Sequence, residues 1–163
     1  MPGAPHLLPE LTVAAVIERD GRFLVVEERA ARRLVLNQPA GHVEDGEGLV
    51  EAVVREVREE TAWRFVLQAV VGIYLWSQPE RRRTYLRVAF CGEVRDHDPL
   101  QPLDDGIVHT HWYTRAQLLG HAPRLRTPMV LRCVDDYRAG ARFPLDIVRE
   151  LPVEEVRSRA VAL

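Results

Sequence analysis

Residues 41–63 constrain the fold more than any other stretch of this sequence. A loop rich in glycine and proline leads into an uninterrupted helical pattern from about Leu49 to Thr61. At the helical period of 3.6 residues per turn, one side of this helix is formed by valines: Val50, Val53, Val54 and Val57. We therefore expect a helix that packs this side against a hydrophobic core.

The same helix carries a cluster of carboxylates on another side. Glu56, Glu59 and Glu60 share one arc at i, i+3 and i+4, and like charges at this spacing repel each other. A bound divalent cation would offset this repulsion by coordinating the carboxylates, because Mg²⁺ prefers oxygen ligands and keeps water in its coordination shell. The pattern therefore predicts a metal site, and its alternative is a solvated acidic face.

Composition limits the classes of function that the chain can have. A net charge of −2 gives no general attraction for nucleic acid. The 22 basic residues are all arginine, which excludes a P-loop and Schiff-base chemistry because both require lysine. Cys91 and Cys133 lie far apart without CxxC spacing, so neither a zinc site nor a disulfide framework is expected. With no signal-like start and no long apolar run, the expected compartment is the cytoplasm.

The rest of the chain alternates short strands and helices without a regular βαβ rhythm. Residues 1–10 contain three prolines and are expected to form a loose arm. Strands are expected at residues 11–17, 22–28, 34–36, 65–76 (as one strand or two), 84–94 and 108–113. Helices are expected after the N-cap Thr114, at 128–138 with Gly140 closing the helix, and at 154–160.

The 41–63 stretch resembles the Nudix box, G-x5-E-x7-R-E-U-x-E-E-x-G-U, where U is an apolar residue. The matching positions are Gly41, Glu47, Arg55, Glu56, Val57, Glu59, Glu60 and Trp63. Ala62 stands where the family has a glycine that ends the helix, which leaves the helix stop open. The lead-in Pro39-Ala40-Gly41-His42 is similar to that of a phosphatase branch of the family.

This resemblance implies a fold and a set of roles for the residues of the box. The implied fold is an α/β/α sandwich with a mixed β-sheet, formed by residues 1–163 as a single domain. The implied cofactor is Mg²⁺, with Mn²⁺ as a substitute. The implied ligands are Gly41, through its backbone carbonyl, and Glu56, Glu59 and Glu60.

The implied catalytic residues are Glu56, Glu59 and Arg55, with Glu56 or Glu59 as the base. Glu47 is expected to support the site by pairing with Arg55, which also balances the charge of the carboxylates. The candidate substrate-binding residues are Trp76, His42 and Asp105, with Asp104 as the alternative to Asp105.

The implied activity is Mg²⁺-dependent hydrolysis of small phosphorylated molecules. The expected substrates are nucleoside tri- and diphosphates and thiamine-related pyrimidine diphosphates, with orthophosphate released. One alternative is an ADP-ribose or nucleotide-sugar pyrophosphatase, because Pro79 stands sixteen residues after the box. Another is an inactive module that binds nucleotide. The expected assembly is a monomer or homodimer, with no nucleic acid and no membrane as partner.

Overall fold

The computed structural model describes residues 8–151, which form a mixed β-sheet with helices on both faces. The main path of the sheet has the order β3-β2-β1-β6-β5, while β4 pairs with β1 and β7 with β2. β1 and β6 run parallel and the other pairs antiparallel. The strands are β1 (Glu10–Arg19), β2 (Arg22–Ala30), β3 (Arg33–Asn37), β4 (Ala40–His42), β5 (Arg64–Gln78), β6 (Arg83–Arg95) and β7 (Ile107–Thr114).

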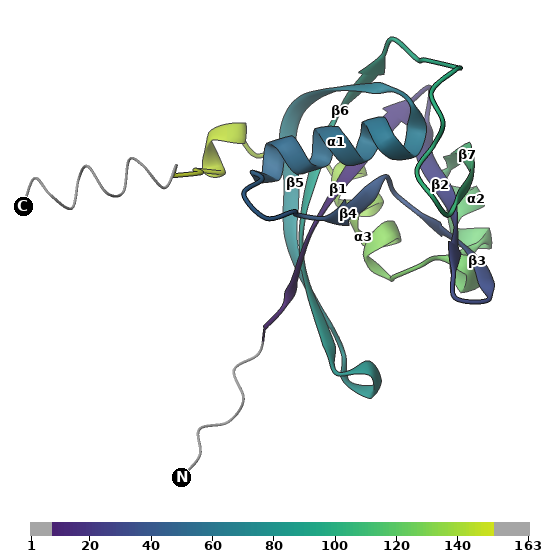
Figure 1. Cartoon of the computed structure of the whole chain (residues 1–163), viewed down its shortest axis with the longest axis horizontal. Helices are drawn as coiled ribbons and strands as arrows, with labels where there is room; N and C mark the ends of the chain where they lie inside the picture. The colour runs from purple at the N-terminus through teal and green to yellow at the C-terminus, as the bar shows by residue number, and fades with distance from the viewer. Residues whose placement is uncertain (1–7, 152–163) are drawn as a thin grey trace, which may run out of the picture.

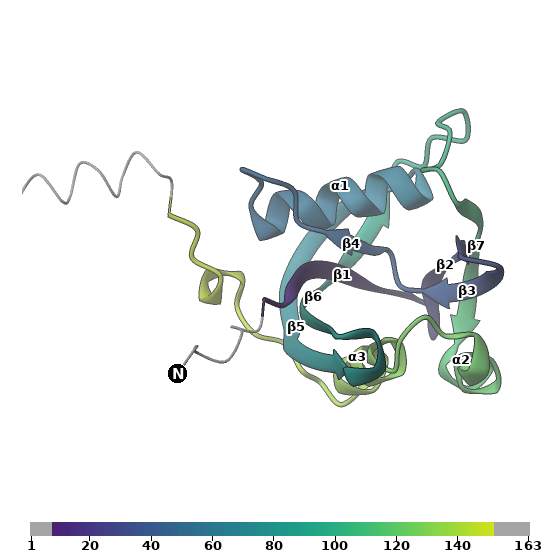
Figure 2. The ribbon, with the colours of Figure 1, turned by 60° about the horizontal axis from the view of Figure 1, so that its bottom comes forward.

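Helices cover the sheet from opposite sides. α1 (Leu49–Thr61) lies on one face, and α2 (Arg115–Gly120) and α3 (Met129–Arg138) lie on the other, with the strands between them (Figures 1 and 2). Short 3-10 turns occur at Pro79–Arg81, Ala122–Arg124 and Leu145–Ile147. The expected α/β/α sandwich with a mixed sheet is confirmed. No helix of the described residues is long and apolar enough to cross a membrane.

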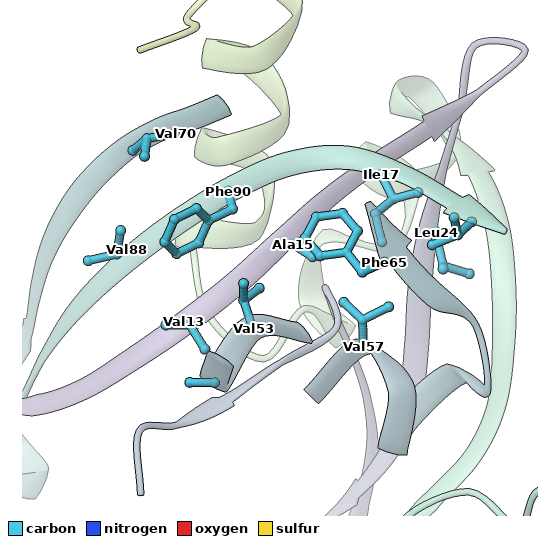
Figure 3. Close-up of a cluster of buried hydrophobic side chains, with 12 residues drawn as sticks. Val13, Ala15, Ile17, Leu24, Val53, Val57, Phe65, Val70, Val88 and Phe90 are labelled. Carbon is cyan, nitrogen blue, oxygen red and sulfur yellow. The ribbon is translucent and has the colours of Figure 1, made fainter. Parts of the chain in front are cut away.

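Two hydrophobic clusters hold these layers together, because successive strand residues point to opposite faces of the sheet. On the α1 side, Val53 and Val57 of the helix pack among strand residues that include Val13, Val88 and Phe90 (Figure 3). The second cluster lies on the α3 side and contains Val16, Val25, Ala89, Cys91, Leu118, Met129, Cys133 and Val134. The valine side of the predicted helix is therefore the side that builds the core.

The two ends of α1 are fixed by specific contacts. At its start, Glu150 Oε1 accepts a hydrogen bond of 2.6 Å from the Leu49 N–H, and Glu51 accepts one of 3.1 Å from the Gly48 N–H. At its end, Ala62 adopts a left-handed conformation with φ of 59° and donates its N–H to the Arg58 carbonyl. The helix thus ends at Thr61 as predicted, although an alanine takes the conformation that favours glycine.

The structure corrects several expectations drawn from the sequence. The arm was expected to extend to residue 10, but Glu10 already belongs to β1 and pairs with Tyr85. The loop after Pro39 contains the short strand β4, because Gly41 pairs with Val13 of β1. Residues 65–76 lie within the single strand β5, which has register irregularities near Ala69 and Gly72. The helix expected at 154–160 lies outside the described residues.

Candidate active site

A bidentate ion pair fixes the loop before α1 to the helix. Arg55 Nε lies 2.7 Å from Glu47 Oε1, and Arg55 Nη2 lies 3.0 Å from Glu47 Oε2. This geometry matches the planar fork of a guanidinium to both oxygens of one carboxylate. The hydrogen bond from Arg55 lowers the pKa of Glu47. The pair therefore sets the position of the loop relative to the helix.

The same guanidinium also contacts the carboxylate cluster. Arg55 Nη1 lies 2.8 Å from Glu56 Oε1 and 3.0 Å from Glu59 Oε2. Arg55 Nη2 donates a further hydrogen bond of 3.0 Å to the His42 carbonyl. One side chain thus joins the loop, the backbone of β4 and two of the predicted ligands. Its hydrogen bonds to Glu47, Glu56 and Glu59 raise the pKa of Arg55.

Gly41 and Glu56 pack directly against each other. A Cβ atom at position 41 would overlap the Glu56 carboxylate. The absence of a side chain at Gly41 therefore allows the carboxylate to approach the backbone of β4. This close contact brings together two of the residues that the sequence assigned to the metal site.

Glu60 is the most deeply placed carboxylate of the cluster. It is 5 % exposed, and its Oε2 accepts a hydrogen bond of 2.9 Å from the Ala40 N–H. The bond connects the last turn of α1 to the residue immediately before Gly41. It thereby fixes the backbone on which the Gly41 carbonyl lies.

Burial and like charge disfavour the ionised forms of two of these carboxyl groups. Desolvation raises the pKa of Glu56, and nearby Glu59 and Asp104 raise it further, while Arg55 opposes the shift. Desolvation also raises the pKa of Glu60 well above its usual value, and the charges of Glu56, Glu28 and Asp104 add to the effect. A cation at this place would favour the charged forms.

The loop before β7 approaches the cluster through Asp104. Its N–H donates a hydrogen bond of 2.9 Å to the Glu59 carbonyl, and its charge raises the pKa of both Glu56 and Glu60. Asp105, the preferred candidate from the sequence, is not among the main charges that act on them. Its N–H instead bonds to Asp104 Oδ1 at 2.9 Å. Of the two aspartates, Asp104 is therefore the one whose charge acts on the cluster.

The two remaining candidates for substrate binding make their contacts away from the carboxylate cluster. The His42 ring points to Glu10, with Nε2 2.8 Å from Oε2, and does not contact the carboxylate cluster. Trp76 stacks on Tyr85 in the β5–β6 hairpin, with ring centroids 5.7 Å apart.

The donor set of the cluster fits a hard divalent cation. It consists of oxygen atoms alone, from Glu56, Glu59, Glu60 and the Gly41 carbonyl, which are the ligands that Mg²⁺ and Mn²⁺ prefer. Among residues 8–151, no three Asp, Glu, His or Cys side chains converge closely enough in this arrangement to chelate an ion. Arg55 bonds to two of the carboxylates here and acts as their counter-ion.

Comparison with known proteins identifies the family to which this fold and site belong. The NUDIX domain model matches residues 8–131, and the chain belongs to the Nudix family. It is a Nudix hydrolase that acts on phosphoanhydride bonds, and enzymes of this family generally use divalent metal ions. The resemblance seen in the box is thereby confirmed.

The similarity extends well beyond the box. Phosphatase NudJ of Escherichia coli K12 is 38% identical over 140 residues, which are 86% of this chain and 90% of that protein. A NUDIX hydrolase structure from Nitrosomonas europaea is 44% identical with a TM-score of 0.86, and the match covers 88% of this chain and 98% of that one. The NUDIX domain of Shewanella oneidensis NrtR, solved with ADP ribose, shares the fold at 18% identity and a TM-score of 0.67, over 85% of this chain and 94% of that one. The predicted closeness to the NudJ branch is confirmed.

Sequence reasoning missed residues that lie next to the site. Glu28 of β2 acts electrostatically on both Glu60 and Arg87, and Arg87 of β6 is almost completely buried. A signal was present, because Arg87 interrupts the apolar run from Leu86 to Phe90. A charged residue inside such a strand either has a partner or serves a ligand.

Proposed function

We propose that this hydrolase uses Mg²⁺, with Mn²⁺ as a substitute, to cleave nucleoside tri- and diphosphates and thiamine-related pyrimidine diphosphates, releasing orthophosphate. The observation that carries the proposal is the cluster of Glu56, Glu59 and Glu60 against the backbone at Gly41. The similarity to phosphatase NudJ over most of the chain supports this choice of substrates and product.

The metal would be held by Glu56, Glu59, Glu60 and the Gly41 carbonyl. When bound, the cation neutralises phosphate charge and favours attack of water on phosphorus. The remaining chemistry comes from the chain itself. Glu56 or Glu59 accepts a proton from the attacking water.

Arg55, Glu47 and Asp104 surround the carboxylates of Glu56, Glu59 and Glu60, and we assign them supporting roles. In our proposal Arg55 orients the carboxylates of Glu56 and Glu59, while its pair with Glu47 fixes the loop. Asp104 is the acidic residue that we assign to the edge of the site. Trp76 and His42 remain candidates for contacts with the organic part of the substrate.

We also propose that the whole chain forms a single domain and acts as a monomer or homodimer on small molecules. A net charge of −2 supports the absence of nucleic acid as a partner. The expectations of a cytoplasmic location and of no membrane partner stay predictions.

A product screen tests the proposed substrates. The purified protein is incubated with nucleoside tri- and diphosphates, thiamine diphosphate and ADP-ribose, with Mg²⁺ and with a chelator, and products are separated by chromatography. We expect orthophosphate from the nucleoside and pyrimidine diphosphates, only with the cation present. Release of AMP from ADP-ribose, without orthophosphate from the others, would instead identify the alternative pyrophosphatase. Nucleotide binding without any turnover would identify an inactive module.

A further inference from the structure

The loop between β6 and β7, residues 96–106, runs across the end of α1 (Figures 1 and 2). The last carbonyl groups of a helix have no partner within the helix, so their donors must come from elsewhere. This loop supplies two of them from its backbone. The Asp98 N–H bonds to the Ala62 carbonyl at 3.0 Å, and the Asp104 N–H bonds to the Glu59 carbonyl at 2.9 Å. The loop is therefore attached to the part of α1 that carries the proposed metal ligands.

Gln101 attaches the same loop to α1 through its side chain. Its Nε2 donates a hydrogen bond of 2.6 Å to the Arg58 carbonyl. That carbonyl already accepts the Ala62 N–H at 3.0 Å, and Gln101 uses its second lone pair. The end of the helix is thus closed without Gln101. The bond from Gln101 serves to fix the loop on the helix.

A tight turn determines where the Gln101 side chain begins. The Gln101 N–H bonds to the Asp98 carbonyl at 3.3 Å, and the Leu100 N–H bonds to Asp98 Oδ1 at 3.0 Å. Aspartate at the first position and proline at the second, here Pro99, are the residues that favour such a turn. The local sequence therefore directs Gln101 toward the end of α1.

The backbone between Gln101 and Asp104 has little freedom. Pro102 has a fixed φ, and it restricts the residue before it, Gln101, to extended conformations. On the other side of Asp104 a second turn begins, in which the Ile107 N–H bonds to the Asp104 carbonyl at 3.1 Å and Gly106 has a φ of 94°. A hydrogen bond at Gln101 therefore controls the position of Asp104, three residues later.

Asp104 needs such an anchor because its surroundings repel it. Its charge acts on the carboxyl groups of Glu56 and Glu60. It also lies at the C-terminal end of α1, where the helix dipole disfavours a negative charge. Before a cation binds, this repulsion pushes the loop away from the helix. The bond from Gln101 to the Arg58 carbonyl opposes that movement.

We propose that Gln101 is a positioning residue, which holds Asp104 beside the carboxylates of α1 so that the site is ready for its cation. This inference rests on the proposed function, because it concerns the metal site of that same reaction. The affinity of an oxygen site for a divalent cation depends on the number of its charged groups and on its rigidity. Release of the loop removes one charge from the site and loosens it, so loss of the Gln101 bond weakens cation binding.

Substitution Gln101→Leu tests this role, because leucine has a similar size and donates no hydrogen bond. The matched control is Gln68→Leu, since Gln68 also donates through Nε2, at 3.1 Å to Glu93, but on the surface of β5 and β6. The dissociation constant of Mn²⁺ is measured without substrate, by electron paramagnetic resonance of the free ion. We expect it to rise about 3- to 10-fold in Gln101→Leu, the effect of one hydrogen bond, and less than about twofold in Gln68→Leu. An equal change in the two variants, or none in either, would overturn the inference.

A double-mutant cycle with Asp104→Asn shows whether Gln101 acts through Asp104. In the Asp104→Asn background no carboxylate is left at this position to be held. Gln101→Leu should therefore change Mn²⁺ binding by less than about twofold in that background. If Gln101→Leu weakened Mn²⁺ binding by the same factor in both backgrounds, Gln101 would act on α1 alone and the inference would fail.

Gln101→Asn decides the question if Gln101→Leu does not fold. Asparagine keeps the amide but is one methylene shorter, so it cannot reach the Arg58 carbonyl from the same backbone position. We expect the same weakening of Mn²⁺ binding, and wild-type affinity in Gln101→Asn would overturn the inference. If the wild-type protein binds Mn²⁺ but releases no phosphate from any substrate, the proposed function fails while these titrations still decide the role of Gln101. If the wild-type protein binds no Mn²⁺, both proposals fail.

Discussion

Two arginines in this protein show opposite arrangements. Arg55 is partly exposed and makes close contacts with Glu47, Glu56 and Glu59. Arg87 is buried and makes a single long hydrogen bond to Gln38 within the described residues. A charge with complete partners holds a structure in place, while a buried charge without them is stable only if something else supplies its partners. The difference separates an arginine whose bonds hold the site together from one whose buried Nε lacks an acceptor among the described residues.

Among substitutions that alter the packing around the Arg55 network, the largest effect is expected from Gly41→Ala. The new Cβ would collide with the Glu56 carboxylate and displace it from the backbone of β4. We expect kcat/KM to fall by about 100- to 1000-fold, the size seen when a group that stabilises the transition state is removed. Gly120→Ala is the matched control, because a Cβ there meets no atom within 4 Å. Full activity of Gly41→Ala would show that this close contact is not needed.

Arg55→Lys tests whether the paired arginine needs its planar fork. Lysine keeps the charge but cannot bond Glu47 through two nitrogens while also contacting Glu56 and Glu59. We expect the free energy of unfolding to fall by about 1 to 3 kcal/mol, measured by urea denaturation, together with a loss of activity. Arg58→Lys is the control, since Arg58 makes no bidentate pair and has only a 3.4 Å contact with Asp98 and a 3.1 Å hydrogen bond to the Ala62 carbonyl among the described residues. It should change stability by less than about 0.5 kcal/mol. Equal effects of the two substitutions would contradict a special role for the Arg55 network.

Val57→Ala tests whether the side of α1 that packs in the core is independent of the side that carries the carboxylates. Val57 is completely buried in the cluster between α1 and the sheet. The variant should lose about 2 kcal/mol of stability through the lost contacts and the cavity, with kcat/KM changed by less than about threefold below the melting temperature. Val54→Ala, at a partly buried position, should lose less stability. A large loss of activity in a folded Val57→Ala protein would mean that the two sides of the helix are not independent.

The smallest effect is expected at an exposed pair remote from the site. Asp135 accepts two bonds of 2.9 Å from Arg115, and this lowers the pKa of Asp135 below its usual value of 3.8. Because the folded-state pKa is depressed, the stabilisation is present above the usual value and is lost as the pH falls through the folded-state pKa. Asp135→Asn should therefore lower the melting temperature slightly at pH 7, and this difference from the wild type should disappear as the pH falls through the folded-state pKa of Asp135. An unchanged acid profile would show that the pair contributes nothing to stability.

Features set by residues close together in the sequence could be predicted, while features that combine distant segments could not. The bounds of α1 followed from valine periodicity, and the carboxylates followed from their spacing, because both depend on residues close in sequence. The buried surroundings of Arg87 combine residues of β1, β6 and α3 with Gln38, and no local sequence pattern brings these segments together. The sequence could not show whether Asp104 or Asp105 acts on the carboxylate cluster, because this depends on the backbone conformation of the loop before β7.

The central claim is that the carboxylates of α1 perform metal-dependent hydrolysis, and Glu59→Gln tests it most directly. Glu59 is the most exposed of the proposed ligands, so an amide at this position should leave the fold intact by circular dichroism and melting temperature. At saturating Mg²⁺, we predict that phosphate release from a nucleoside diphosphate falls by about 1000-fold relative to wild type. Unchanged release by the folded variant would contradict the account.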